Sequence, residues 1–554
     1  METRRPEGRR AREWLLGALM LALACLPPAV VAGGVLAALL LWVSDWSPAW
    51  TLLVFWLGVV GAAAGGRGPL PGRAVRPEDE PELAALVRDV ADRLGFRGPL
   101  LVRIVPVVQA SLGPVRVSGV RSHVLFLGLP LLRALTEAEL ASVVAHELAH
   151  VRHVGGGRAT FLRYARSRLT DRLDGRVRPL APPAAPLLRA SQPALWRMET
   201  AADADAARVA GTGATASALR RTGRLHSAFE GLAEPWLSEL AERDAWPEDF
   251  YDALDAALAD PHVDRRAART AAEDDAIDPY AMTDHPPVAT RVAALPAHTG
   301  TGTYGDAPVP LHRAAEIARW CVRRLALQDG EEEDDVEAVR LLEMPLDELR
   351  ALDDGTGTAL LFRATGHDPP AAAVAAALDT LADGTWRQLA RRLEPGLRWV
   401  PAAVRGQMAA KVFTAAVTGT LAEALETSGW TPTTRWLGTV LTAPDGRTVD
   451  LRALIGDAVT TADPTVPRTL LGTTAPDRPA ATPDRPTAPS QTPTTPDRTP
   501  NVPSQATTAP DQTTAPDQTP TTPGQPTTPD RTTTPDRTTA PGQAAAPDQR
   551  ETPA

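Results

Sequence analysis

The segment from Thr136 to His150, T-E-A-E-L-A-S-V-V-A-H-E-L-A-H, constrains the fold of this chain more than any other part of it. It places His146 and His150 four residues apart, a spacing that advances about 6 Å along an α-helix and returns to nearly the same face. Two imidazoles in this arrangement converge on one metal ion, with Glu147 beside it. The chain is therefore expected to form a helix here and to bring a further ligand to it from elsewhere.

The start of this helix carries its own signal. Thr136 suits the N-cap position, and Glu139 three residues later suits the reciprocal bond of a capping box. Apolar side chains follow at Leu140, Val143 and Val144. The sequence therefore predicts that both histidines lie on a buried helix.

A tetrahedral catalytic zinc site needs a third protein ligand, and the segment from Ala194 to Gly211 offers one. This Ala-rich stretch has no internal Gly or Pro and ends at a glycine suited to a helix C-cap, so we expect a second helix. Glu199 and Asp203 lie four residues apart on one face of it, whereas Asp205 points elsewhere. Glu199 can then bind the metal while Asp203 accepts a hydrogen bond from a ligand histidine.

Three sequence blocks carry a family resemblance: H-E-L-A-H at 146–150, E-x-x-A-D at 199–203 and H-P-x-x-x-x-R at 285–291. In this order and spacing they resemble the HtpX-like membrane zinc metallopeptidases, gluzincins related to the CAAX prenyl endoproteases. The resemblance covers about residues 78 to 297. One departure concerns residues 107 to 111, which read Val-Val-Gln-Ala-Ser where the family usually has an Asn-Ala pair on the substrate-side edge strand.

The resemblance implies a peptide-hydrolysing zinc site. It assigns one Zn²⁺ per chain to His146, His150 and Glu199, where the ion polarises a water molecule and the scissile carbonyl of a polypeptide substrate. Glu147 is then the general base toward the water and the general acid toward the leaving amine.

The same resemblance assigns a further donor for the oxyanion to His285 or Arg291. Alternatively, His285 only caps or packs a turn before the helix that starts at Val288, and Arg291 is a structural ion-pair partner. The remaining histidines follow no ligand pattern; His153, on the first zinc-ligand helix, is expected to be solvated or to lie near the site without binding the metal.

The N-terminal region predicts membrane insertion. No charged residue occurs from Trp14 to Val43, and a second apolar run extends from Ala49 to about Ala64, so two transmembrane helices are expected within 14–66. Arginines precede the first run and follow the second, which predicts that both flanks and the catalytic domain are cytoplasmic. The protein is thus expected to be a multi-pass protein of a bacterial cell membrane, in contact with the lipid bilayer.

An alternative interpretation treats residues 1 to 24 as a signal peptide, because an Arg-rich start and an apolar core precede Ala22-Leu23-Ala24. Cys25 would then also allow a lipoprotein. Cleavage would invert the topology and place the catalytic domain outside the membrane. The apolar run continues through Val43 without the polar break of a mature N-terminus, which favours the transmembrane prediction.

The fold class expected is α+β and mainly helical. Pro81 to Phe96 predicts an amphipathic helix, and Leu100 to Val108 and His123 to Leu129 predict strands. The insert from Gly155 to Pro193 is rich in Arg and Pro and is expected to form a lid, to lie on anionic lipid, or to be an exposed polar connection. The expected divisions are a basic segment at 1–13, transmembrane helices at 14–66, a zincin-type metallopeptidase domain at 77–300, a mainly helical accessory domain at 301–462 and a disordered Thr/Pro/Asp/Gln-rich repeat tail at 463–554.

Composition excludes several other classes. The net charge of −10 gives no nucleic-acid signature, and Cys25 and Cys321 are too few for a disulfide framework or a cysteine zinc site. Lys411 is the sole lysine among abundant arginines, which suggests a high-GC bacterial genome. Any protein partner is expected to bind through 301–462 or the tail.

The leading prediction is a membrane-anchored zinc endopeptidase, acting on damaged or unassembled membrane proteins as the resemblance suggests. One alternative is a sensor-transducer metallopeptidase of the beta-lactam receptor type, which also carries H-E-L-A-H and a later glutamate. Another is a catalytically silent, zinc-binding membrane scaffold.

Overall fold

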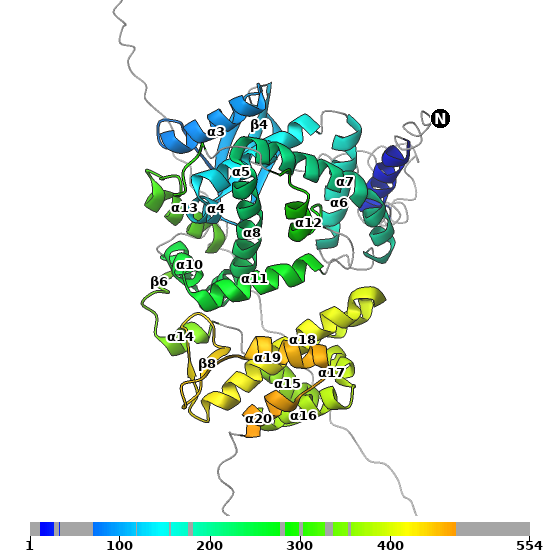
Figure 1. Ribbon diagram of the computed structural model, residues 1–554, viewed down its shortest axis with the longest axis vertical. Helices are drawn as coiled ribbons and strands as arrows, with labels where there is room; N and C mark the ends of the chain where they lie inside the picture. Colours follow the sequence, from blue (N-terminus) through cyan, green and yellow to red (C-terminus); the bar gives the residue numbers. More distant parts are fainter. Residues whose placement is uncertain are drawn as a thin grey trace, which may run out of the picture. The chain divides into compact units, whose positions relative to one another are not determined.

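The computed structural model describes residues 11–26, 33, 70–117, 119–153, 157–174, 181–276, 283–297, 303–326, 336–352 and 356–472. These residues form a mainly helical α+β structure with a few small sheets (Figure 1). The second predicted membrane span and nearly all of the predicted tail at 463–554 lie outside the described residues.

A four-stranded mixed sheet forms one side of the first core. Its order is β1 (Arg73–Ala74), β2 (Leu100–Val105), β4 (Val120–Gly128) and β3 (Ala110–Val117). The strand β2 runs parallel to β4, β3 runs antiparallel to it, and the amphipathic helix α3 (Pro81–Leu94) precedes β2. The predicted helix and the two predicted strands are confirmed, and β3 is one of the two edge strands of the sheet within the described residues, the other being β1.

The helix with the H-E-x-x-H pattern is α5 (Glu137–His153). Its predicted capping box is present, because the Thr136 amide donates to Glu139 Oε2 at 2.9 Å and the Glu139 amide donates to Thr136 Oγ1 at 3.3 Å. Leu140 and Val144 are completely buried. The local start signal and the apolar face thus hold α5 inside the core, with its histidines facing α7.

The third-ligand helix is α7 (Ala181–Ala210), which starts earlier than predicted and contains Pro186 and Pro193. It ends directly before Gly211, whose φ of +96° favours glycine. Ahead of it lies α6 (Gly157–Asp174), so the described parts of the Gly155–Pro193 insert are helical. The alternative of an exposed polar connection does not fit these parts, since Leu162, Ala165 and Leu169 recur at helical spacing and are buried.

A small hydrophobic cluster joins residues 11–26 to α6 and α7. Residues 11–26 are helical, and Met20 and Ala24 pack with buried residues of α6 and α7. The opposite side of this segment is exposed and apolar at Leu15, Leu19 and Leu26, and Trp14 is about half-exposed with its ring against Phe161 of α6. The rest of the predicted first span, apart from Gly33, lies outside the described residues, so the two transmembrane helices stay a prediction.

The first core continues well beyond the zinc-ligand helices, and its buried residues extend as far as Leu352. The described residues of 309–326 and 336–352 therefore contribute to it, although the sequence places them in an accessory domain. The further elements are α4 (Leu129–Ala134), α8 (Thr212–Ala228), the π-helix η2 (Phe229–Ala233), α9 (Glu234–Ala241), β5 (Ala245–Pro247), α10 (Phe250–Leu258), α11 (Pro261–Ala276), α12 (Val288–Ala293), α13 (Ala314–Ala326), β6 (Glu337–Val339) and α14 (Leu346–Arg350).

A second core is built around α18 (Ala402–Glu426), in which Phe413, Val417 and Leu421 are completely buried. Among the described residues, only Val404–Glu426 is long and apolar enough to span a membrane, and 56% of its most apolar window is buried in the protein. It serves here as the central helix of a core. The surrounding elements are α15 (Thr356–Thr365), α16 (Pro370–Ala382), α17 (Trp386–Leu393), the 3₁₀ helix η4 (Pro395–Trp399), β7 (Thr431–Pro432), β8 (Val440–Thr442), β9 (Thr448–Asp450), α19 (Leu451–Thr461) and α20 (Thr465–Gly472).

The capping box predicts a measurable stability change. Thr136→Ala removes the hydroxyl that accepts from the Glu139 amide and should lower the free energy of unfolding by about 1 kcal/mol in urea denaturation. Thr136→Ser keeps the hydroxyl and should stay close to the parent protein. An equal loss in both variants would show that the methyl group, not the cap, stabilises the start of α5.

Candidate metal centre

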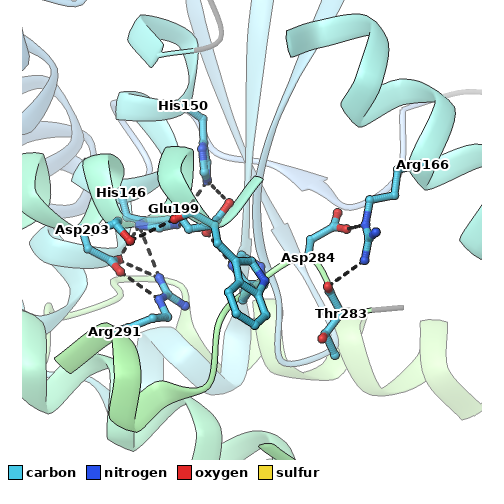
Figure 2. A network of polar contacts seen from close by, with 11 residues as sticks. His146, His150, Arg166, Glu199, Asp203, Thr283, Asp284 and Arg291 are labelled. Carbon is cyan, nitrogen blue, oxygen red and sulfur yellow. Dashed lines mark hydrogen bonds and ion pairs between the residues drawn. The ribbon is translucent and has the colours of Figure 1, made fainter. Parts of the chain in front are cut away.

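Three potential metal ligands meet where α5 packs against α7. His146 and His150 come from successive turns of α5, Glu199 comes from α7, and all three are buried (Figure 2). His146 Nε2 lies 3.1 Å from His150 Nε2 and 3.3 Å from Glu199 Oε2, and His150 Nε2 lies 3.5 Å from Glu199 Oε1. The group could therefore hold one metal ion.

The donor atoms suit zinc in kind and in spacing. Two imidazole nitrogens and a carboxylate oxygen form one of the common three-ligand sets of catalytic zinc sites. Tetrahedral bonds of about 2.0–2.2 Å place neighbouring ligand atoms about 3.4 Å apart. The observed separations of 3.1 to 3.5 Å agree with this spacing. The donor set therefore suits zinc, with one Glu199 oxygen near each histidine.

Asp203 orients the first histidine. Its Oδ1 lies 2.9 Å from His146 Nδ1, and the Arg291 guanidinium holds both of its oxygens at 2.7 and 2.9 Å. Burial raises the pKa of Asp203, but hydrogen bonds from Arg291 and His146 outweigh this effect and lower the pKa to about 2. An ionised carboxylate only accepts hydrogen bonds, so His146 Nδ1 carries a proton. Burial lowers the pKa of His146, but hydrogen bonds to Asp203 and Glu199 outweigh this effect and raise the pKa to about 9, so a metal that binds at Nε2 would displace a proton from it.

The other two ligands, His150 and Glu199, have the charge states that metal binding requires. Burial, and then the neighbouring His146, lowers the pKa of His150, which keeps this imidazole neutral. Burial acts to raise the pKa of Glu199, but hydrogen bonds from His146 and His285 lower it overall. A neutral imidazole and an ionised carboxylate are the forms that bind a cation.

Glu147 lies beside the ligands and lines a cavity of about 730 Å³, a size in the usual range for ligand pockets. His146, Trp196, His285 and Arg291 line the same cavity. Glu147 is buried, and burial is the main cause that raises its pKa. A carboxylate whose pKa is shifted toward neutrality accepts and returns protons more effectively than an ordinary surface glutamate.

The third sequence block reaches the same site. His285 is half-exposed, and its Nδ1 lies 2.6 Å from Glu199 Oε2. The residue at the N-cap of α12 is Pro287, with no side-chain cap bond, so His285 contacts a metal ligand and does not cap that helix. Arg291 is buried and paired with Asp203, which matches the ion-pair alternative for this residue.

Other residues have more ordinary surroundings. Asp205 points away from the metal ligands and pairs with Arg208, as the helix face predicts. His153 is the last residue of α5, and its side chain is outside the described part of the chain. Sequence reasoning missed Arg166, a buried arginine of the insert that contacts Asp284 beside His285. Nothing in the local sequence separates Arg166 from the other arginines of α6.

Comparisons of the chain with protein-family models, with curated proteins and with solved structures gave no match. The functional argument therefore depends on the geometry of the residues. That geometry defines a buried His-His-Glu group able to hold a metal ion, with a carboxylate and a cavity next to it.

The contact between Asp203 and His146 predicts a graded loss of zinc affinity. Asp203→Asn leaves all three ligands in place but weakens the orientation of His146, and should lower the affinity about 10- to 100-fold in competition with a chromogenic chelator. His150→Ala removes a ligand and should lower it further. Asp205→Asn is the matched control, because Asp205 is an equally buried carboxylate of α7 that pairs elsewhere. Equal weakening by both Asn variants would contradict the assignment.

Proposed function

We propose that this protein is a zinc-dependent endopeptidase. The observation that carries the proposal is the position of Glu147, a buried carboxylate with a raised pKa that lines a substrate-sized cavity together with the ligand His146. His146, His150 and Glu199 would hold the ion, which when bound would supply Lewis-acid polarisation of water and of a substrate carbonyl.

The protein's own groups provide the proton transfers. Glu147 accepts a proton from the attacking water and delivers it to the leaving amine, a role that needs a carboxylate beside the site that is not itself a ligand. His285 donates from Nδ1 to Glu199, and Nε2 of this half-exposed ring, when it also carries a proton, can donate to the substrate oxygen that becomes negative. Arg291 acts through Asp203, because its guanidinium is held in a two-point contact with that carboxylate.

The edge strand supports an extended polypeptide as the substrate. Gln109, directly before β3, and Ala110, its first residue, line the cavity, and β3 pairs within the described residues only with β4. Its outer backbone groups can therefore pair with a peptide in the manner of an added strand. Apolar side chains from α5, α8 and α12, at Val143, Leu219 and Val288, line the cavity and would accept an apolar substrate side chain.

The resemblance to HtpX-like peptidases extends this proposal to a multi-pass protein of the bacterial cell membrane, with a cytoplasmic catalytic domain and damaged or unassembled membrane proteins as substrates. The exposed apolar residues Trp14, Leu15, Leu19 and Leu26 support a lipid contact for the N-terminal helix. A sensor-transducer peptidase and a silent scaffold are the alternatives to this proposal.

Removal of the base tests the reaction. Glu147→Gln keeps the size of the side chain but cannot accept the proton, so turnover of an unfolded model protein should fall by about a hundredfold or more. The zinc content should stay at one ion per chain. Equal turnover in both proteins would refute the mechanism. If both zinc-loaded proteins were inactive, the silent scaffold would be favoured.

The proposed topology predicts the location of residue 76. A reporter enzyme that is active only outside the cytoplasm, fused after Arg76, should be inactive, because the arginines on both flanks of residues 14–66 favour the cytoplasmic side. A matched fusion at Asp45, between the two apolar runs, should be active. Activity after Arg76 would instead support the signal-peptide alternative with the catalytic domain outside.

A further inference from the structure

Arg166 has surroundings that a surface helix does not require. It is completely buried on α6, a helix with many exposed charged residues. Burying a guanidinium is costly unless its donors are satisfied by charges and hydrogen bonds. The buried guanidinium of Arg166 is therefore expected to be held by a defined set of hydrogen-bond acceptors.

These acceptors lie on two separate segments. On α7, Arg166 Nη1 donates to the carbonyl of Leu188 at 2.9 Å and to Ser191 Oγ at 2.8 Å. On the segment before α12, Nη2 donates to the carbonyl of Thr283 at 2.8 Å, and Nε contacts the carboxylate of Asp284 (Figure 2). One guanidinium thus joins α6, the helix that carries Glu199, and the two residues that precede His285.

The segment held in this way borders the proposed active site. Thr283 and Asp284 line the same cavity as Glu147, and His285 follows directly with its contact to Glu199. The two prolines after His285 stiffen the chain on the other side, at 286 and 287. His285 is therefore fixed between a proline pair and a residue anchored by Arg166.

We propose that Arg166 is a positioning residue, which sets the location of the His285 imidazole relative to Glu199 and the cavity. The assignment rests on the proposed peptidase function only for its kinetic consequence, since the positioning itself is a property of the segment 283–291. A misplacement of about 1 Å in a catalytic group can cost about a hundredfold in rate, so an anchor of this kind affects turnover without touching substrate.

The geometry requires arginine and not merely a positive charge. The planar guanidinium offers five donors in a fixed fork, which can reach α7 and Asp284 at the same time. A lysine ammonium at position 166 would keep the charge but carry its donors on one atom. Arg166→Lys should therefore loosen the segment 283–291 while leaving the metal ligands in place.

The test combines hydrogen exchange with a double-mutant cycle on the full-length chain. Four proteins are compared with the parent: Arg166→Lys, His285→Ala, the double variant, and Arg133→Lys as a control. Arg133 is an arginine that pairs with Asp252 and Asp255 on α10 and does not line the cavity. Its substitution removes a similar guanidinium contact elsewhere in the first core.

Arg166→Lys should speed amide exchange in peptides covering 283–291 by about tenfold or more, with exchange in α5 unchanged. It should lower kcat about tenfold with KM within about twofold, and this loss should disappear in the His285→Ala background. Arg133→Lys should change neither quantity. Unchanged exchange in 283–291, or equal acceleration by Arg133→Lys, would overturn the proposal.

The two readouts separate this inference from the proposed function. If the parent hydrolyses no polypeptide, the peptidase proposal fails while hydrogen exchange still decides whether Arg166 anchors the segment. If the parent is active but Arg166→Lys and His285→Ala lower kcat by independent, multiplying factors, Arg166 does not act through His285 and the positioning role is refuted.

Discussion

The buried contact between Asp203 and His146 is the interaction on which the site depends. It fixes the tautomer and the ring orientation of His146, and the fork from Arg291 keeps Asp203 ionised and in place. Without that carboxylate, the imidazole could turn Nε2 away from His150 and Glu199. Because Asp203 lies one turn after Glu199 on α7, the same helix supplies a ligand and the group that orients another ligand.

Burial explains why so many charges are gathered here. Glu147, Glu199 and Asp203 are three buried carboxylates, and a low-dielectric environment disfavours each of them when it is unpaired. Asp203 is compensated by Arg291, and Glu199 by contacts with His146 and His285. Burial acts to raise the pKa of all three, but only for Glu147 is the pKa raised overall, because its compensation is the weakest. The same physical environment therefore favours metal ligation at Glu199 and proton transfer at Glu147.

Short-range patterns made part of this structure predictable. The capping box, the apolar face of α5 and the end of α7 at Gly211 depend on residues within a few positions of each other, and the structure contains all of them. The three ligands could be assigned to one site from the sequence because zinc chemistry limits the choice of side chains. The helices within 157–193 were not predicted, because their arginines and prolines suggest a connection, whereas buried contacts with residues 11–26 stabilise them. Such contacts have no fixed spacing in the sequence.

The helix α7 connects the insert to the candidate metal site. Its first half packs with α6 and residues 11–26, and its second half carries Glu199 and Asp203. Arg166 adds a direct link from α6 to the segment of His285, so both sides of the Glu199–His285 contact are attached to the same pair of helices. A displacement of α6 would then move the ligand and its neighbouring histidine together. The geometry between them is preserved because Arg166 is hydrogen-bonded both to α7, the helix that carries the ligand, and to the segment that carries His285.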